Sequence, residues 1–124
     1  MSKIFIILMM IFCHIVDDYC LQGILASMKQ KEWWKKNEQY KELYKYDYIV
    51  ALIMHSLSWT FMIMLPIAFV NNFEIGAAFL IIFVLNMVIH AVVDDLKANK
   101  FKINLILDQT IHLIQIIMTA VVLL

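Results

Sequence analysis

Four long apolar segments constrain this chain more than any other feature of its sequence. They span about residues 4–28, 48–70, 75–96 and 103–124. Each is about 20 residues or longer, which is enough for a helix rising about 1.5 Å per residue to cross a hydrocarbon core of roughly 30 Å. Strands are excluded because the segments lack a period-two alternation, and a backbone in lipid must satisfy its own hydrogen bonds. The sequence therefore predicts an all-α, four-helix transmembrane bundle.

Composition supports an integral membrane protein with a single domain over residues 1–124. Hydrophobic residues make up 64% of the chain, charged residues make up 16%, and the mean hydropathy is +0.82. A soluble domain of this length could not bury so much apolar surface. The net charge is zero, so the broad basic surface of nucleic-acid-binding proteins is missing. We expect membrane lipid as the partner and no nucleic acid, with a homo-oligomer left open.

The lysines predict how the helices are oriented. All ten basic residues are lysines, and all but Lys3 lie in the connection 29–47 or in the connection that follows residue 96. The connection at residues 71–74 has none. Because cytoplasmic connections carry the excess of positive charge, we expect the first and third connections in the cytoplasm and both termini outside.

The connection 29–47 is the only sizeable segment outside the predicted spans. In it, Trp33, Tyr40, Leu43 and Tyr44 recur near helical spacing. This pattern predicts a short helix at the membrane interface, with its aromatic rings at headgroup depth. Its six lysines and two tryptophans are compatible with a patch that binds anionic lipid or nucleic acid, but we expect a solvated cytoplasmic loop with an aromatic anchor.

Ionisable side chains interrupt the apolar segments, although each costs several kcal/mol in a bilayer and therefore points to function. Three segments carry a histidine and an aspartate four residues apart, so each pair points from one helix face. Counted along the helices, the four segments present imidazole or carboxylate within about 5 Å of one height. The candidate metal ligands are His14, Asp18, His55, His90, Asp94, Asp108 and His112.

Imidazole and carboxylate together suit zinc, iron or manganese, and we expect zinc first. Facing helices of a bundle build metal sites from such paired residues. The candidates exceed what one tetrahedral ion needs, so either two ions are bound or some residues orient the ligands. A buried His–Asp network without metal, and a path for protons or ions, are the alternatives.

Four further polar residues complete the candidate site. Asp17 and Asp95 lie about 100° around the helix from the neighbouring aspartates, so they face an adjacent helix or act behind the ligands. They are the candidate catalytic residues. Either of them would act as the general base, because the spans contain no glutamate. Gln22 and Lys97 extend the polar stripes and are the candidate substrate-binding residues. Lys97 would hold an anionic headgroup, or would simply snorkel to the interface.

Three motifs carry a resemblance that covers nearly the whole chain. H-x3-D-[FY]-x2-Q falls at residues 14–22, H-x3-D-x2-K at 90–97 and D-Q-x2-H at 108–112. With these the chain resembles small four-helix bacterial and phage membrane proteins of unknown function, which are similar in pattern to membrane-bound metal-dependent hydrolases. The resemblance implies a multi-pass protein of the bacterial plasma membrane. Many members carry a second histidine one turn after His55, and Trp59 stands there in this chain, which implies one ligand fewer.

Two classes of function follow from these observations. The leading hypothesis is a metal-dependent hydrolase that acts on a lipid-linked or amphiphilic substrate, with one or two ions polarising its ester or phosphoryl group. The alternative is a non-enzymatic membrane protein: a metal or proton transporter, a phage lysis protein or a structural protein. A transporter would need polar residues that continue to the outer face, and the segments offer few of them there.

Overall fold

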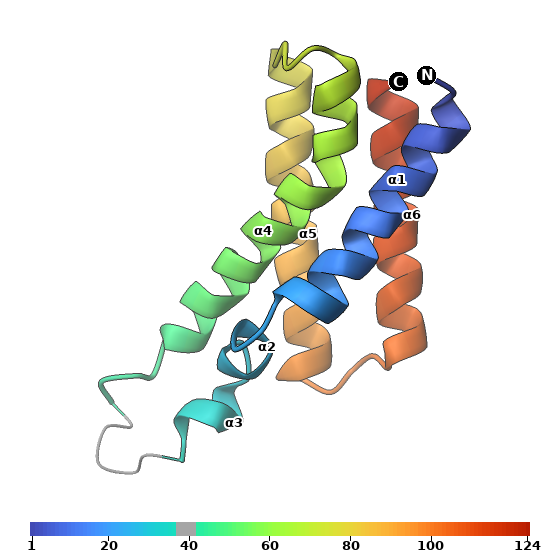
Figure 1. Ribbon diagram of the computed structural model, residues 1–124. Coiled ribbons are helices and arrows are strands. Elements are labelled where there is room, and N and C mark those ends of the chain that lie inside the picture. The colour runs from blue at the N-terminus through green and yellow to red at the C-terminus, as the bar shows by residue number, and fades with distance from the viewer. Residues whose placement is uncertain (37–41) are drawn as a thin grey trace.

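The computed structural model describes residues 1–36 and 42–124, and in these residues the chain is helical without strands. Four long helices pack into a bundle, whose arrangement is shown in Figure 1. They are α1 (Lys3–Val16) with its π-helical continuation η1 (Asp17–Leu21), α4 (Asp47–Val70), α5 (Ala77–Ala98) and α6 (Leu105–Leu123). Two single-turn helices, α2 (Leu25–Met28) and α3 (Lys31–Trp34), lie between η1 and α4. The predicted all-α, four-helix fold class is confirmed.

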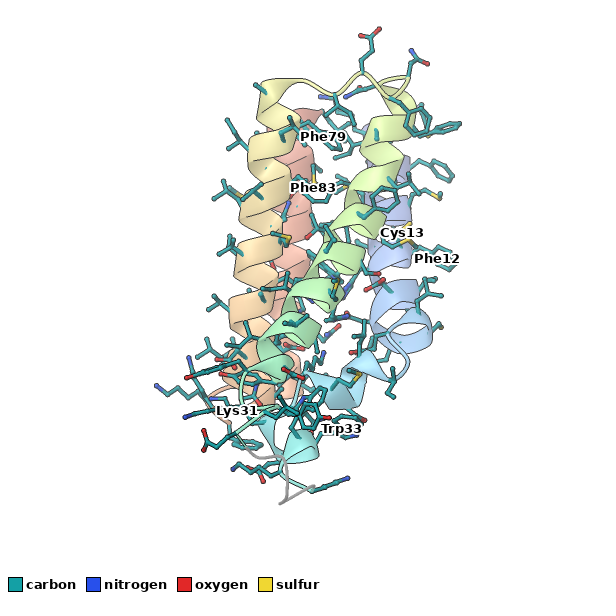
Figure 2. The ribbon with its side chains drawn as sticks, turned by 90° about the vertical axis from the view of Figure 1, so that its left-hand side faces the viewer. Phe12, Cys13, Lys31, Trp33, Phe79 and Phe83 are labelled. Atoms are coloured by element: carbon teal, nitrogen blue, oxygen red, sulfur yellow. The ribbon has the colours of Figure 1, made fainter. Side chains whose placement is uncertain are left out.

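All four long helices are sufficiently long and apolar to cross a membrane. Their outer faces carry large hydrophobic side chains, as lipid contact requires. Phe12 on α1 points away from the bundle and is 61% exposed, whereas Phe79 and Phe83 on α5 pack against its interior (Figure 2). The bundle thus has an apolar exterior in addition to an apolar core, which is typical of membrane proteins.

The helices form a ring in chain order. α1 and α5 each pack against both α4 and α6, so α1 and α5 lie diagonally opposite each other. The two termini and the α4–α5 connection lie at one end, here named the terminus end (Figure 1). The other end holds α2, α3 and the α5–α6 connection with their lysines, and is named the lysine end. The apolar core fills the half of the bundle near the termini and consists of Ile6, Met10, Trp59, Ile63, Met64, Ile67, Ile116 and Ala120.

The first long helix ends at Leu21, well before residue 28, where the sequence predicted its end. Its last turn is π-helical, and Gly23 follows with φ at +51°, a left-handed conformation that glycine adopts without the steric penalty of a Cβ atom. The chain then turns into α2. Hydropathy alone placed the boundary too late because Ile24 and Leu25 continue the apolar run beyond this turn.

The other three long helices begin and end within about two residues of the predicted bounds. Asn104 caps α6, since its side-chain oxygen accepts a hydrogen bond of 2.9 Å from the backbone N–H of Leu107. In the connection 29–47, the predicted short helix is α3, which contains Trp33 and is a single turn long. Tyr44 lies in a turn instead. Tyr40, which the prediction also used, lies outside the described residues.

Candidate metal centre

Polar side chains from all four long helices meet inside the half of the bundle nearer the lysine end. The sequence predicted seven metal ligands, and the structure brings all of them to this region. Six are buried, with exposed fractions of 3% or less, and the Asp18 side chain is 10% exposed. The i, i+4 spacing explains the convergence, because each His/Asp pair shares the inward face of its helix.

One group of donor atoms comes from Asp18, His55 and His90. One potential ligand atom of each residue lies within 4.8 Å of the others. His55 Nε2 is 3.4 Å from Asp18 Oδ1 and 3.1 Å from His90 Nε2. Ligand atoms about 2.0–2.2 Å from a tetrahedral ion are about 3.3–3.6 Å apart. The spacing of this group therefore suits a small divalent cation.

A second group consists of His90, Asp94 and His112, and the same limit of 4.8 Å holds among its ligand atoms. Asp94 Oδ1 is 3.7 Å from His112 Nε2, and Asp94 Oδ2 is 3.8 Å from His90 Nε2. The rings of His90 and His112 stack with centroids 4.2 Å apart. The two groups have His90 in common, so the donor atoms form one continuous cluster across the bundle.

A contact on the side of the His112 ring that faces away from the cluster holds the ring in place. Its Nδ1 lies 3.1 Å from Gln115 Oε1, and the Gln115 amide nitrogen in turn donates to Asn86. The carbonyl oxygen of Gln115 is an acceptor, so Nδ1 of His112 carries a proton and donates it. In the neutral ring, Nε2 then presents its lone pair to the cluster. Such outer contacts orient metal-binding histidines.

Asp17 lies behind His55 and faces the neighbouring helix α4, in agreement with its angular offset. It is 0% exposed, and the Ser58 hydroxyl donates to its Oδ1 at 2.6 Å. Its Oδ2 is 3.8 Å from His55 Nδ1, while His55 Nε2 faces Asp18. Asp17 is thus placed to orient His55 from the side opposite the donor atoms.

Both ring nitrogens of His14 are engaged by other side chains. The indole N–H of Trp59 donates to Nδ1 at 2.7 Å, and Nε2 lies 3.0 Å from Gln109 Oε1. An indole N–H can only donate, so Nδ1 accepts and Nε2 carries the proton. The sequence named His14 as a ligand, but in this arrangement neither nitrogen has a free lone pair for a metal ion.

Trp59 is a central residue that the sequence did not assign to the site. Its side chain is 0% exposed and stacks on His90, with ring centroids 4.2 Å apart and planes 21° from parallel. It also contacts the rings of His14 and His112. The available signal was its position one turn after His55, which places both side chains on the same face of α4.

Two lysines reach the buried carboxylates from the lysine end. Lys29 Nζ is 2.6 Å from Asp94 Oδ2, and Lys97 Nζ is 2.7 Å from Asp108 Oδ2. Lys97 was predicted to be a substrate-binding residue, and the structure pairs it with a carboxylate. Lys29 was not predicted. Asp17 and Asp18 have no lysine partner among the described residues, so the cluster keeps negative charge that attracts a cation.

The two remaining candidates, Asp95 and Gln22, make their hydrogen bonds and ion pairs with groups other than the imidazoles. Asp95, with an 18% exposed side chain, is 3.0 Å from Lys100 Nζ and accepts a hydrogen bond from Asn99 at the end of α5. Gln22 donates its side-chain N–H to the backbone oxygen of Asp18. Neither contact places these residues beside the imidazoles. Asp95 has the environment of a helix-end residue in a surface ion pair.

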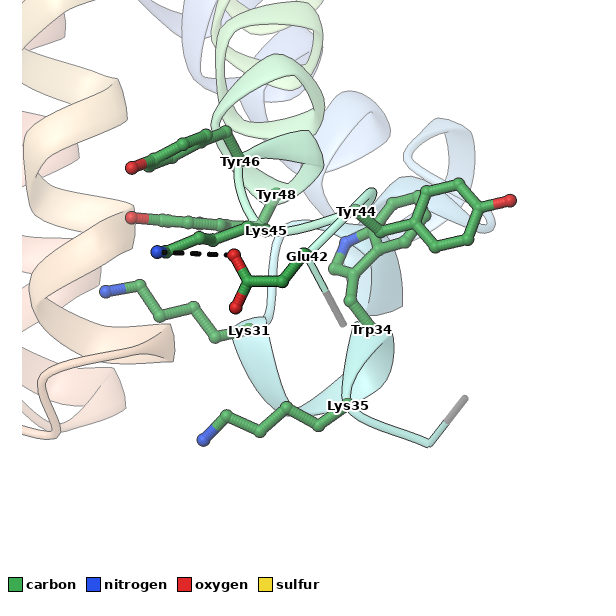
Figure 3. A pocket seen from close by; sticks show the side chains of 8 residues that line it. All are labelled: Lys31, Trp34, Lys35, Glu42, Tyr44, Lys45, Tyr46 and Tyr48. Carbon is green, nitrogen blue, oxygen red and sulfur yellow. Dashed lines mark ion pairs between the residues drawn. The ribbon is translucent and has the colours of Figure 1, made fainter. Parts of the chain in front are cut away.

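A hollow of about 600 Å³ lies at the lysine end (Figure 3). Lysines and aromatic side chains line it, but these lysines are already engaged. Lys45 pairs with Glu42 at 3.7 Å, and Lys31 lies over the ring of Tyr48 at 4.7 Å from its centroid. This balance of charge and aromatic surface is typical of a segment anchored at a membrane interface.

Comparisons of the chain with protein-family models, curated proteins and solved structures give no match. Function is therefore inferred from the cluster itself. Its imidazole and carboxylate donors, held inside an apolar bundle, could hold a metal ion.

Proposed function

We propose that this protein binds a divalent transition-metal ion, zinc first, at the cluster inside its membrane bundle. One observation carries the proposal: imidazoles and carboxylates from different helices form two overlapping groups whose ligand atoms lie within 4.8 Å of one another. Burial makes uncompensated carboxylates costly, and a divalent cation offsets that cost. The proposed ligands are Asp18, His55, His90, Asp94 and His112.

We further propose that the ion serves hydrolysis of a lipid-linked or amphiphilic substrate. A group of three protein ligands, such as His90, Asp94 and His112, leaves a coordination position open, as in catalytic zinc sites. An ion of this kind lowers the pKa of its water toward neutrality and polarises an ester or phosphoryl oxygen. Membrane lipid is the proposed source of the substrate because the cluster lies within the spanning part of the bundle.

The motif pattern supports a proposed relationship to the small four-helix membrane proteins of bacteria and phages. In that setting the protein belongs to the plasma membrane, with the lysine end in the cytoplasm. A substrate would then reach the cluster from the cytoplasmic leaflet, since the cluster lies in the half of the bundle nearer that end.

Elemental analysis of the detergent-purified protein tests the metal site. We expect near-stoichiometric zinc, iron or manganese in the wild type and a clear loss in His55→Ala and His112→Ala. His14→Gln is the matched histidine control, and we expect it to keep its metal because both His14 nitrogens already have partners. A folded wild type that is metal-free and takes up none on titration would contradict the proposal and favour a structural His–Asp network.

The hydrolase proposal needs a separate assay. We expect the metal-loaded protein to cleave lipid esters or phosphate esters, and chelation followed by metal addition to abolish and restore that activity. Metal binding without hydrolysis across both substrate classes would reject the enzyme and retain the metal site.

A further inference from the structure

We propose that the cluster holds two metal ions and that the carboxylate of Asp94 bridges them, one oxygen on each. The inference rests on the proposed metal site and adds the number of ions and their positions. Two adjacent sets of donor atoms carry it. Each set contains buried atoms that make no hydrogen bond within the described part of the chain.

The first position lies between η1, α4 and α5. Its donors are Asp18 Oδ1, His55 Nε2, His90 Nε2 and Asp94 Oδ2. His55 Nε2 is within 3.4 Å of each of the other three atoms. Asp18 Oδ1 is buried and accepts no hydrogen bond from any described residue. Four electron-pair donors around one point are the environment that a divalent cation stabilises.

The second position lies between α5 and α6. His112 Nε2 is 3.4 Å from Asp108 Oδ1 and 3.7 Å from Asp94 Oδ1. Both His112 Nε2 and Asp108 Oδ1 are buried without a hydrogen-bond partner among the residues that the structure describes. Because His112 already donates its Nδ1 proton to Gln115, its neutral ring presents a lone pair to two carboxylate oxygens. Three such atoms facing one another suit a bound cation.

The orientation of Asp94 links the two positions. Its Oδ2 lies 3.3 Å from His55 Nε2 in the first set, and its Oδ1 lies 3.7 Å from His112 Nε2 in the second. One carboxylate therefore presents a different oxygen to each set. Paired catalytic ions are typically about 3.5–4 Å apart. The Asp94 side chain is 4% exposed, and His90 lies one turn before it on the same helix.

The contacts of Lys29 and Lys97 are compatible with two bound metal ions. Lys29 and Lys97 each contact the Oδ2 atom of a carboxylate, on Asp94 and Asp108 respectively. A carboxylate has about four lone-pair directions, so an ammonium group and a metal ion can share it. The rival arrangement has a protonated His112 in the second position, with its Nε2–H bonded to a carboxylate. That arrangement would admit one ion at most.

Manganese separates the two arrangements, because it suits these ligands and is paramagnetic. Full-length protein in detergent is stripped with chelator and dialysed against Mn²⁺, and its metal content and electron paramagnetic resonance spectrum are measured. We expect two ions per chain with an exchange-coupled signal. Asp108→Asn should retain one ion, with the signal of isolated Mn²⁺. Asp47→Asn, at the start of α4, is the matched control and should retain two coupled ions.

The wild-type measurement decides the inference even where Asp108→Asn fails to fold. One bound ion overturns the two-ion centre but leaves the proposed function standing, whereas no bound ion overturns both. Two ions without exchange coupling overturn the bridging role of Asp94. Two coupled ions in Asp108→Asn would overturn the assignment of the second position.

Discussion

At the scale of single residues, the partners of the ring nitrogens distinguish His55 and His112 from His14. His55 and His112 have a carboxylate or an amide oxygen near Nδ1, and each turns Nε2 to the cluster. His14 instead accepts from Trp59 and contacts Gln109. His14 and His112 each have an aspartate four residues away, so the residue pattern does not separate them, and the contacts of the ring nitrogens do.

Trp59→Phe tests the structural assignment of His14. Phenylalanine keeps an aromatic ring against His90 but leaves His14 Nδ1 without its donor, and an unsatisfied buried group costs about 1–3 kcal/mol. We expect a lower melting temperature in detergent and an unchanged metal content. If the metal is lost from a protein that stays folded, His14 or Trp59 contributes directly to the metal site.

Asp17→Asn tests the orienting role of the carboxylate behind His55. The asparagine is similar in shape but loses the negative charge beside His55 Nδ1, and loss of such a partner weakens metal affinity about 10–100-fold. Competition with a chromophoric chelator measures the affinity. Asp95→Asn is the matched control and should bind metal as the wild type does. Weakening in Asp95→Asn equal to that in Asp17→Asn would contradict the distinction between the two aspartates.

At the scale of elements, the turn that follows the first long helix contains a glycine in the left-handed conformation. Gly23 has φ at +51°, whereas Gly76, before α5, has φ at −88° and open space around its missing Cβ. Alanine in the left-handed conformation costs about 1–2 kcal/mol. We therefore expect Gly23→Ala to lower the melting temperature, and Gly76→Ala to change it little. Equal effects would show that the turn after η1 adapts to a side chain.

Hydropathy predicted the number and the approximate position of the long helices because lipid requires an apolar run of fixed length. It could not predict where the first helix ends. The apolar run continues through Leu25, and the break comes from the π-helical turn at Asp17–Leu21 and from the backbone of Gly23. In that turn Asp17 and Asp18 contact Ser58 and His55 of α4. A local sequence pattern carries no information about contacts between helices.

At the scale of the whole molecule, the sequence predicted the cluster but not its counter-charges. Pairs at i, i+4 fix a shared helix face on three helices, so these polar stripes were expected to meet inside a bundle, with His55 on the fourth helix. Lys29 contacts Asp94 because the chain after Gly23 returns to the end of α5. There the Asn99 side-chain amide donates to the Lys29 carbonyl oxygen. Such a contact depends on how helix ends pack, which periodicity does not describe.

The separation of the molecule into a lysine end and a terminus end predicts its orientation, with the lysine end in the cytoplasm. Single cysteines at Asn72 and Lys102, both exposed and at opposite ends, test this in a Cys13→Ala/Cys20→Ala background. In intact cells, a membrane-impermeant thiol reagent should label Asn72→Cys and spare Lys102→Cys until the cells are lysed. The cysteine-free parent is the control for background labelling. The reverse pattern would place the lysine end outside, and a substrate would then reach the cluster from the outer leaflet.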